Sequence, residues 1–432
     1  MLKDKLKIIL SEFQATPLPA LMERELTVDL SVVRSSVTKV ITIIGPRRAG
    51  KTFFLYQIMK KFLADGSDIR DFVYVNFEDE RILPMTAAEL HLILDAWHEL
   101  HDRETKPLLF FDEIQNITGW ENFVRRLVDQ GHNILVSGSN SKLLSSDIAV
   151  ALRGRTLTYV LFPFSFREFL VSQGVNLEKN ILYGPKRHRV QQLFENYLAT
   201  GGYPEIVQLD NDQTRTRILQ DYFHAIFYRD LVERYRIKHS ELLRQWLGIL
   251  MMNIASLISY RKVENDFKSR GMRISSSTLA TYSRYVEDIF FGFFVEMYSE
   301  SVRKRQINPK KFYLIDHGLH NYLTLAFSAN KGRVLENLVC LELKRRGHEI
   351  FYYRTKTGAE VDFLVRDDTG MRLIQVCYDL TNIETANREK KALAQGMKEL
   401  GLKTGLIFTY SEKRDEEDEY NGPHCQDIKL PR

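Results

Sequence analysis

One short glycine-containing run limits what this chain can fold into more than any other feature. Residues 45–52 read Gly-Pro-Arg-Arg-Ala-Gly-Lys-Thr, directly after the β-branched run Val40–Ile44. The next segment, residues 53–63, has the apolar spacing of an amphipathic helix. A strand, this loop pattern and a helix in that order are the setting in which backbone N–H groups cradle phosphates. The run therefore predicts an α/β sheet whose first loop holds a nucleotide.

Each part of the loop has an expected partner on that nucleotide. Lys51 is expected to reach the β- and γ-phosphates, and the hydroxyl of Thr52 to bind Mg²⁺. The cofactors predicted are ATP and Mg²⁺. The candidate nucleotide-binding residues are Gly45, Pro46, Arg47, Arg48, Ala49, Gly50, Lys51, Thr52 and Phe53.

Two acidic residues follow the apolar run 108–111, which predicts another strand. Asp112 is expected to hold Mg²⁺ and Glu113 to polarise the attacking water. Hydrolysis needs a carboxylate next to the metal ligand and simple binding does not, so the pair predicts an ATPase. After the next apolar run, 134–137, Ser139 and Asn140 are candidates for sensing the γ-phosphate and orienting water. A simple turn at the end of the strand is the alternative for these two residues.

Two arginines come before the fifth expected strand, residues 157–162. An arginine at this place is a candidate finger that completes the nucleotide site of a neighbouring subunit, an interaction worth roughly 10³–10⁵ in rate. Arg155 is favoured over Arg153, and an ordinary solvated arginine is the alternative for either.

Strand and helix signals alternate through the first 165 residues. The expected strands are apolar without polar alternation, which is typical of a parallel sheet covered by helices on both faces. Before them, the sequence predicts a helix over residues 2–13, a turn at Pro17 and Pro19, and a second helix through Arg24.

A helix–turn–helix signal lies at residues 263–289, followed by strands at 293–298 and 311–315 around a basic hairpin, the layout of a winged helix. Between residues 261 and 311 there are eleven Lys and Arg against six Asp and Glu. A basic helix and hairpin suit DNA phosphate and groove contacts, although winged helices also mediate protein contacts. The candidate DNA-binding residues are Arg261, Lys262, Arg273, Ser276, Thr278, Arg284, Arg303, Lys304 and Arg305, with Lys310 and Lys311 as further candidates in the wing.

The last hundred residues predict another small α/β unit. Glu336, Asp362 and Gln375 resemble the PD-(D/E)XK nuclease pattern, in which carboxylates hold Mg²⁺ and a lysine activates water. Cys377 stands at the lysine position and cannot supply a cation, although a lysine from elsewhere, such as Lys391, could substitute. A degenerate nuclease fold used for DNA binding or scaffolding is therefore favoured over an active nuclease.

Four runs together resemble a prokaryotic AAA-type ATPase family whose members carry a C-terminal domain of unknown function. They are residues 45–52, the run Val75–Arg81, Gly138-Ser139, and Gly201-Gly202-Tyr203-Pro204-Glu205. The resemblance implies an AAA+ core with strand order 5-1-4-3-2, a small helical lid, a winged helix, a nuclease-like terminal domain, and assembly into a ring, expected to be a hexamer. The expected domains are residues 1–165, 166–210, 211–330 and 331–432.

Composition narrows the remaining choices. No stretch approaches the roughly 18 apolar residues that a membrane span needs. The N-terminus lacks the features of a secretory signal, and the three cysteines have no paired spacing, so a cytoplasmic protein without disulfides is expected. The function predicted is an ATP-driven motor, a translocase or helicase on forked, branched or single-stranded DNA. The alternatives are a signalling or defence NTPase switch that recognises a protein partner, and an ATP-gated DNA nuclease.

Overall fold

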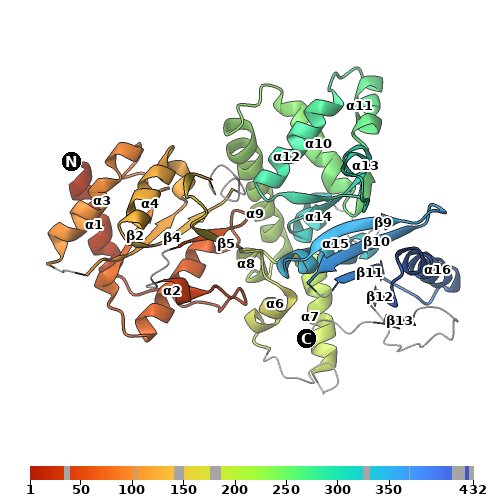
Figure 1. Cartoon of the computed structure of the whole chain (residues 1–432), viewed down its shortest axis with the longest axis horizontal. Helices are drawn as coiled ribbons and strands as arrows, with labels where there is room; N and C mark the ends of the chain where they lie inside the picture. The colour runs from red at the N-terminus through yellow and green to blue at the C-terminus, as the bar shows by residue number, and fades with distance from the viewer. Residues whose placement is uncertain are drawn as a thin grey trace. The chain divides into compact units, whose positions relative to one another are not determined.

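The computed structural model divides into two compact units, residues 1–164 with 288–290, and residues 165–287 with 291–432 (Figure 1). The residues described are 1–33, 39–102, 105–140, 150–175, 186–324, 331–368, 370–410 and 424–427. No helix in these ranges is long and apolar enough to cross a membrane.

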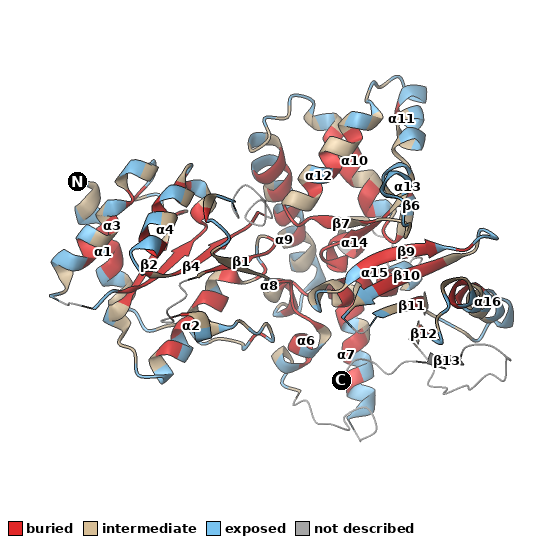
Figure 2. Cartoon of the chain, in the orientation of Figure 1, coloured by how far each residue is buried: buried red, intermediate tan, exposed pale blue. Residues whose placement is uncertain are grey.

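The first unit is built on a five-stranded parallel sheet with the order β2-β3-β4-β1-β5. The predicted order, 5-1-4-3-2, is the same order read from the other edge and is confirmed. Its strands are β1 (Val40–Ile44), β2 (Phe72–Asn76), β3 (Leu108–Asp112), β4 (Asn133–Gly138) and β5 (Thr156–Val160). Almost every residue of β1 to β4 is buried, and the edge strand β5 is half-buried (Figure 2). This burial explains why these strands lack polar alternation.

Among the described residues of this unit, α-helices and short 3₁₀ turns pack around the sheet. They are α1 (Leu2–Ala15), η1 (Leu30–Val32), α2 (Lys51–Ala64), η2 (Ile69–Asp71), η3 (Ala87–Glu89), α3 (His91–Leu100), η4 (Ile114–Asn116) and α4 (Trp120–Asp129). Helix α2 buries Phe54, Leu55 and Ile58 in the core that also holds Ile41 and Phe110 of the sheet. Helix α1 packs on α3 and β2 (Figure 1).

The predicted second N-terminal helix, through Arg24, is wrong. Residues 17–29 contain no helix. Pro17 and Pro19 lack backbone donors and restrict the residues before them. The backbone N–H of Arg24 donates instead to Gln57 Oε1 on α2, at 2.9 Å. The segment is therefore tied to α2 and is not helical.

The second unit begins with helices and then forms a three-stranded antiparallel sheet of order β6-β8-β7. The helices before the sheet are α6 (Phe166–Ser172), α7 (Arg187–Thr200), α8 (Pro204–Val207), α9 (Asp212–Ala225), the π-helical η6 (Ile226–Glu233) and α10 (Ser240–Met252). The sheet region contains β6 (Ser256–Ile258), α11 (Tyr260–Ser269), α12 (Ser276–Asp288), β7 (Gly292–Val295), α13 (Val302–Ile307), β8 (Lys310–Leu314) and α14 (His317–Thr324).

The predicted basic hairpin between β7 and β8 is wrong in form. Arg303, Lys304 and Arg305 lie on the short helix α13. The hydroxyl of Ser301 accepts the N–H of Lys304 at 3.4 Å and so caps the helix. The run contains no glycine for a tight turn, and arginine, lysine and glutamine are good helix formers.

The chain ends in a five-stranded sheet of order β13-β12-β11-β10-β9. Its elements are α15 (Lys331–Arg345), β9 (Glu349–Arg354), β10 (Glu360–Asp367), β11 (Gly370–Cys377), α16 (Ile383–Leu400), β12 (Thr404–Thr409) and β13 (His424–Asp427). Successive residues of β10 face opposite sides. Phe363 packs with Cys340 of α15, and Leu364 packs with Leu393 of α16, so one helix covers each face. The sequence did not predict β13.

Candidate nucleotide site

The glycine-containing loop joins the carboxyl end of β1 to the start of α2. A Cβ on Gly45 would lie 2.1 Å from the backbone oxygen of Leu161, so only glycine fits there. Arg48 and Gly50 have φ values of 68° and 93°, which turn the backbone into the helix. Pro46 and Ala49 are buried within the loop, whereas Phe53 is 55% exposed on α2. The loop therefore has the tight turn at a helix N-terminus that a phosphate site requires.

A buried carboxylate, Asp112, lies beside Thr52 at the end of β3. The Thr52 hydroxyl donates to Asp112 Oδ2 at 2.6 Å, and the Tyr74 hydroxyl donates to the same oxygen at 3.1 Å. Ser137 on β4 donates to Asp112 Oδ1. Burial raises the pKa of Asp112. Mg²⁺ in such sites keeps several waters and takes one or two protein oxygens plus phosphate, so Thr52 and Asp112 fit this ion.

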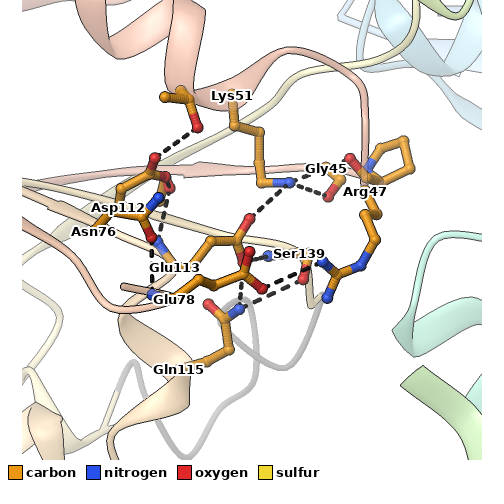
Figure 3. Close-up of polar contacts among 12 residues, drawn as sticks. Gly45, Arg47, Lys51, Asn76, Glu78, Asp112, Glu113, Gln115 and Ser139 are labelled. Carbon is orange, nitrogen blue, oxygen red and sulfur yellow. Dashed lines mark hydrogen bonds and ion pairs between the residues drawn. The ribbon is translucent and has the colours of Figure 1, made fainter. Parts of the chain in front are cut away.

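Glu113 lies next to the loop lysine (Figure 3). Its Oε1 is 3.3 Å from Lys51 Nζ, and its Oε2 accepts from Gln115 Nε2 at 2.5 Å and from the Ser139 N–H at 3.2 Å. Burial alone would raise the pKa of Glu113, but Lys51, Gln115 and Arg47 together lower it to about 2. Glu113 is therefore an ionised carboxylate at neutral pH, held at the point where three strands end.

The lysine ammonium has three partners in the structure. Lys51 Nζ donates to the backbone oxygens of Gly45 and Pro46, at 3.3 and 3.2 Å, besides its contact with Glu113. Its side chain is 4% exposed. An arriving phosphate would compete with these partners for the same ammonium.

The other predicted polar residues of this site gather at the same end of the sheet. Ser139 and Asn140 are buried directly after β4. Arg47 of the loop pairs with Glu78 at 3.2 Å, and the N–H of Glu78 donates to Asn76 Oδ1 at 2.9 Å (Figure 3). The sequence did not predict the contacts of Asn76 and Glu78. The run that contains them, Val75–Arg81, was notable only for its resemblance to the ATPase family.

Two contributors were missed in the sequence altogether. Gln115 holds Glu113 from the turn after β3. Arg24 is 7% exposed and donates to Ala49 O at 2.8 Å and to Phe162 O at 2.6 Å. Arg24 thus fastens the loop to the segment after β5. The sequence predicts a helix through Arg24, and an arginine on such a helix is expected to be exposed. The buried contacts of Arg24 were therefore not predicted.

Replacing Arg24 by methionine should weaken ATP binding about tenfold, because two buried carbonyls lose a charged donor worth roughly 1.5–3 kcal/mol each. The measurement is titration calorimetry with a non-hydrolysable ATP analogue. Arg70→Met is the matched control, since the Arg70 guanidinium is exposed and pairs only locally with Asp68. Equal affinities in the two variants would contradict the positioning role.

The candidate finger residues lie just before β5, at the amino end of the strands, whereas the phosphate loop lies at the carboxyl end. The backbone oxygen of Arg155 accepts the N–H of Val40, the first residue of β1, at 2.8 Å. The phosphate loop follows the last residue of β1, about 16 Å further along the strand. The Arg155 guanidinium pairs with Asp129, and Arg153 has a φ of 52°. Neither arginine is placed to reach the nucleotide of its own chain.

The candidate DNA-binding residues divide by exposure. Ser276 and Thr278 are half-buried, and the hydroxyl of Ser276 donates to Glu264. Arg305 is half-buried, with its guanidinium 6.0 Å from the Phe351 ring centre. The exposed candidates are Arg261, Lys262, Arg273, Arg284, Arg303 and Lys304.

The candidate nuclease residues come together, with an unexpected partner. The side chains of Glu336 and Asp362 share the ammonium of Lys311, which is 2% exposed. The expectation that Lys311 belongs to an exposed wing is therefore wrong, because β8 carries it into the terminal unit. Gln375 Oε1 accepts the N–H of Asp362 at 3.2 Å, whereas Cys377 donates to Asp379 O and Lys391 is exposed.

Comparison with known proteins gives matches along the chain. A model described as an AAA domain matches residues 37–170, and two models of domains of unknown function, DUF8612 and DUF4143, match residues 191–330 and 331–426. An uncharacterized protein of Methanocaldococcus jannaschii, MJ1544, is 40% identical over 380 residues, which are 87% of this chain and 83% of the relative. An uncharacterized protein of Haemophilus influenzae is 27% identical over 340 residues, 78% of this chain and 82% of the relative.

Among solved structures, Cdc6p from Pyrobaculum aerophilum aligns with 78% of this chain and 93% of its own length. The identity is 14% and the TM-score is 0.26. A score this low supports no functional statement.

Proposed function

The chain belongs to the same family as its M. jannaschii relative and carries an AAA domain, and from this premise we propose that it is an ATP-hydrolysing motor that binds and remodels DNA. The observation that carries the hydrolytic half is the Glu113 carboxylate, 3.3 Å from the loop lysine and directly after Asp112. A buried, ionised carboxylate at this point is suited to accept a proton from the attacking water.

The residues of the loop divide the work of binding and hydrolysis. The backbone N–H groups of the loop after Pro46, and those of the start of α2, bind phosphate, and Lys51 neutralises its charge. Thr52 and Asp112 would hold Mg²⁺, which supplies charge neutralisation for the phosphates. Glu113 accepts the proton of the attacking water, while Gln115 and Ser139 hold the carboxylate in position.

Assembly into a ring of subunits completes this proposal. Arg155 and Arg153 lie at the amino end of the strands, opposite to their own loop, which suits a residue that acts on a neighbour's nucleotide. We propose Arg155 as the finger, and a hexamer, which the family resemblance implies, as the ring. The finger stabilises charge that develops on the phosphate during transfer.

The DNA half rests on the order of elements around β6, β7 and β8. Helix α11, a turn, helix α12 and two further strands follow β6, and the sheet order β6-β8-β7 agrees with a winged helix. Ser275 caps α12 by accepting the N–H of Thr278 at 3.1 Å, so this helix has a defined N-terminus, and we propose it as the recognition helix. Exposed arginines on α11, α12 and α13 supply charge for the phosphate backbone.

Adding DNA to the purified chain should raise its ATPase rate, and the increase should fall steeply with salt. Arg303→Gln/Lys304→Gln should lower the slope of log K against log salt by about two, one for each lost phosphate contact. The measurement is fluorescence anisotropy with forked, four-way, duplex and single-stranded DNA over a salt series, run beside ATPase assays.

Arg187→Gln/Arg189→Gln is the charge-matched control, because these arginines are exposed on α7, outside the helix–turn–helix region. This control should keep the full slope. No binding and no stimulation at low salt would contradict a DNA motor and favour a switch that recognises a protein partner.

A further inference from the structure

Four charged side chains meet between β8, α15 and β10 in the second unit. Lys311 Nζ lies 3.0 Å from Glu336 Oε1, 2.8 Å from Glu360 Oε1 and 2.8 Å from Asp362 Oδ1. The side chains of Lys311, Glu336 and Asp362 are 2%, 12% and 10% exposed. Burial alone would lower the pKa of Lys311, but the three carboxylates hold it well above its ordinary value. The lysine is therefore a buried cation among acids.

The atoms around this cation are also occupied by protein partners. Tyr313 donates to Glu336 Oε1 at 2.7 Å, and the N–H of Val376 donates to Asp362 Oδ2 at 2.9 Å. Gln375 Nε2 donates to Glu389 at 2.5 Å. Across the described ranges, the buried polar atoms that lack a partner include none from Lys311, Glu336, Asp362 or Gln375. The carboxylate oxygens that face Lys311 are thus held by protein contacts, while the Glu360 side chain is 34% exposed.

These contacts do not fit a resident divalent cation. Mg²⁺ requires oxygens at about 2.0–2.1 Å in octahedral geometry, with several of its own waters. The Oε1 of Glu336 and the Oδ1 of Asp362 instead face the ammonium of Lys311. In the part of the chain that the structure describes, no group of three or more His, Cys, Asp or Glu side chains is arranged to hold a metal. A nuclease-like arrangement that binds Mg²⁺ would have to expel this lysine.

We propose that the ammonium of Lys311 takes the position between Glu336 and Asp362 that a divalent cation would occupy, so that the terminal domain holds no metal and cleaves no nucleic acid. The lysine comes from β8, a strand of the three-stranded sheet, whereas the carboxylates come from α15 and β10. The same ion cluster therefore fastens the helix–turn–helix region to the terminal domain. This inference depends on the cluster alone and not on DNA being the substrate of the motor.

The first test counts Mn²⁺ bound to the full chain without nucleotide, by electron paramagnetic resonance, in an Asp112→Asn background that removes the loop carboxylate. Asp362→Asn should leave the number of bound Mn²⁺ ions unchanged, and EDTA should leave the Tm of the full chain unchanged. Lys311→Met should bind one more Mn²⁺ ion than the unmodified chain. The double variant Lys311→Met/Asp362→Asn should not bind this ion. A Mn²⁺ ion present with Lys311 intact and lost in Asp362→Asn would overturn the proposal, as would Mn²⁺-dependent DNA cleavage lost in that variant.

The second test measures thermal unfolding. Its result does not depend on whether Lys311→Met binds Mn²⁺. Removing one partner of a buried ion cluster leaves uncompensated charge, so Lys311→Met should lower the Tm by roughly 10 °C or prevent folding. Lys310→Met is the control, because the neighbouring Lys310 is 25% exposed and pairs with Glu296. An equal small shift in both variants would overturn the role of Lys311 in joining the two regions.

Discussion

Glu113→Gln is expected to lower ATP turnover by a factor of about 10²–10⁴ while ATP binding is kept, since a general base contributes about that much. Glutamine preserves the shape of the side chain and loses the group that accepts a proton. Glu113 is also the carboxylate that Lys51 faces at 3.3 Å. A phosphate that drew Lys51 away would remove a charge that lowers the pKa of Glu113, so we expect the carboxylate to be a stronger base with nucleotide bound.

Two measurements separate the steps: single-turnover hydrolysis rates, and titration calorimetry with an ATP analogue. Glu80→Gln, an exposed glutamate outside the site, should match the unmodified chain in both. Lys51→Ala should instead lose binding, because the phosphate loses its cation. Turnover at the unmodified rate in Glu113→Gln would refute the role of Glu113 as the base.

Gly201→Ala should lower the free energy of unfolding by about 3 kcal/mol, through backbone strain and overpacking together. A Cβ on Gly201 would lie 2.1 Å from Asp316 Oδ1 and 2.8 Å from the Gly318 nitrogen, at a φ of 79°. Asp316 is fully buried and accepts the N–H groups of Gly202 at 2.7 Å and Gly318 at 2.9 Å. The alanine would push this carboxylate off its donors.

Urea unfolding of the full chain measures this loss, and a second glycine isolates its cause. Gly271 has a φ of 78°, with no atom within 4 Å of an added Cβ. Gly271→Ala should therefore cost only the left-handed backbone, about 1–2 kcal/mol. An equal loss of unfolding free energy in Gly201→Ala and Gly271→Ala would contradict this prediction, because the close approach to Asp316 would then contribute nothing to stability.

The Gly-Gly-Tyr-Pro run separates two helices: α7 ends at Thr200 and α8 begins at Pro204. The sequence of this run does not predict that Asp316 is the residue that leaves no room for a side chain at Gly201. Asp316 lies 114 residues from Gly202, so no local pattern joins the two. The contacts of Arg24 could not be predicted for the same reason, because its carbonyl partner on Phe162 is 138 residues away in the sequence.

The wing was misassigned for a local reason. A segment between two antiparallel strands suggests a hairpin, but Arg303, Lys304 and Arg305 favour a helix, which Ser301 caps. Lys310 and Lys311 are adjacent in sequence, yet strand alternation points them to opposite sides. One stays near the surface and the other enters the terminal domain.

The sequence by itself determined the phosphate loop, the Asp112-Glu113 pair, the five strands of the first sheet and their order through the family resemblance. The loop, the acidic pair and the strands follow from residues that are close in sequence, where spacing carries the signal, whereas the strand order is what the family resemblance implied. Only the tertiary structure showed that Lys311 pairs with Glu336 and Asp362. It also showed that Arg24 binds the phosphate loop and that Asp316 accepts the N–H of Gly202. Each of these is a contact between distant segments, and burial makes its partner obligatory because an unpaired charge or polar group in the core is costly.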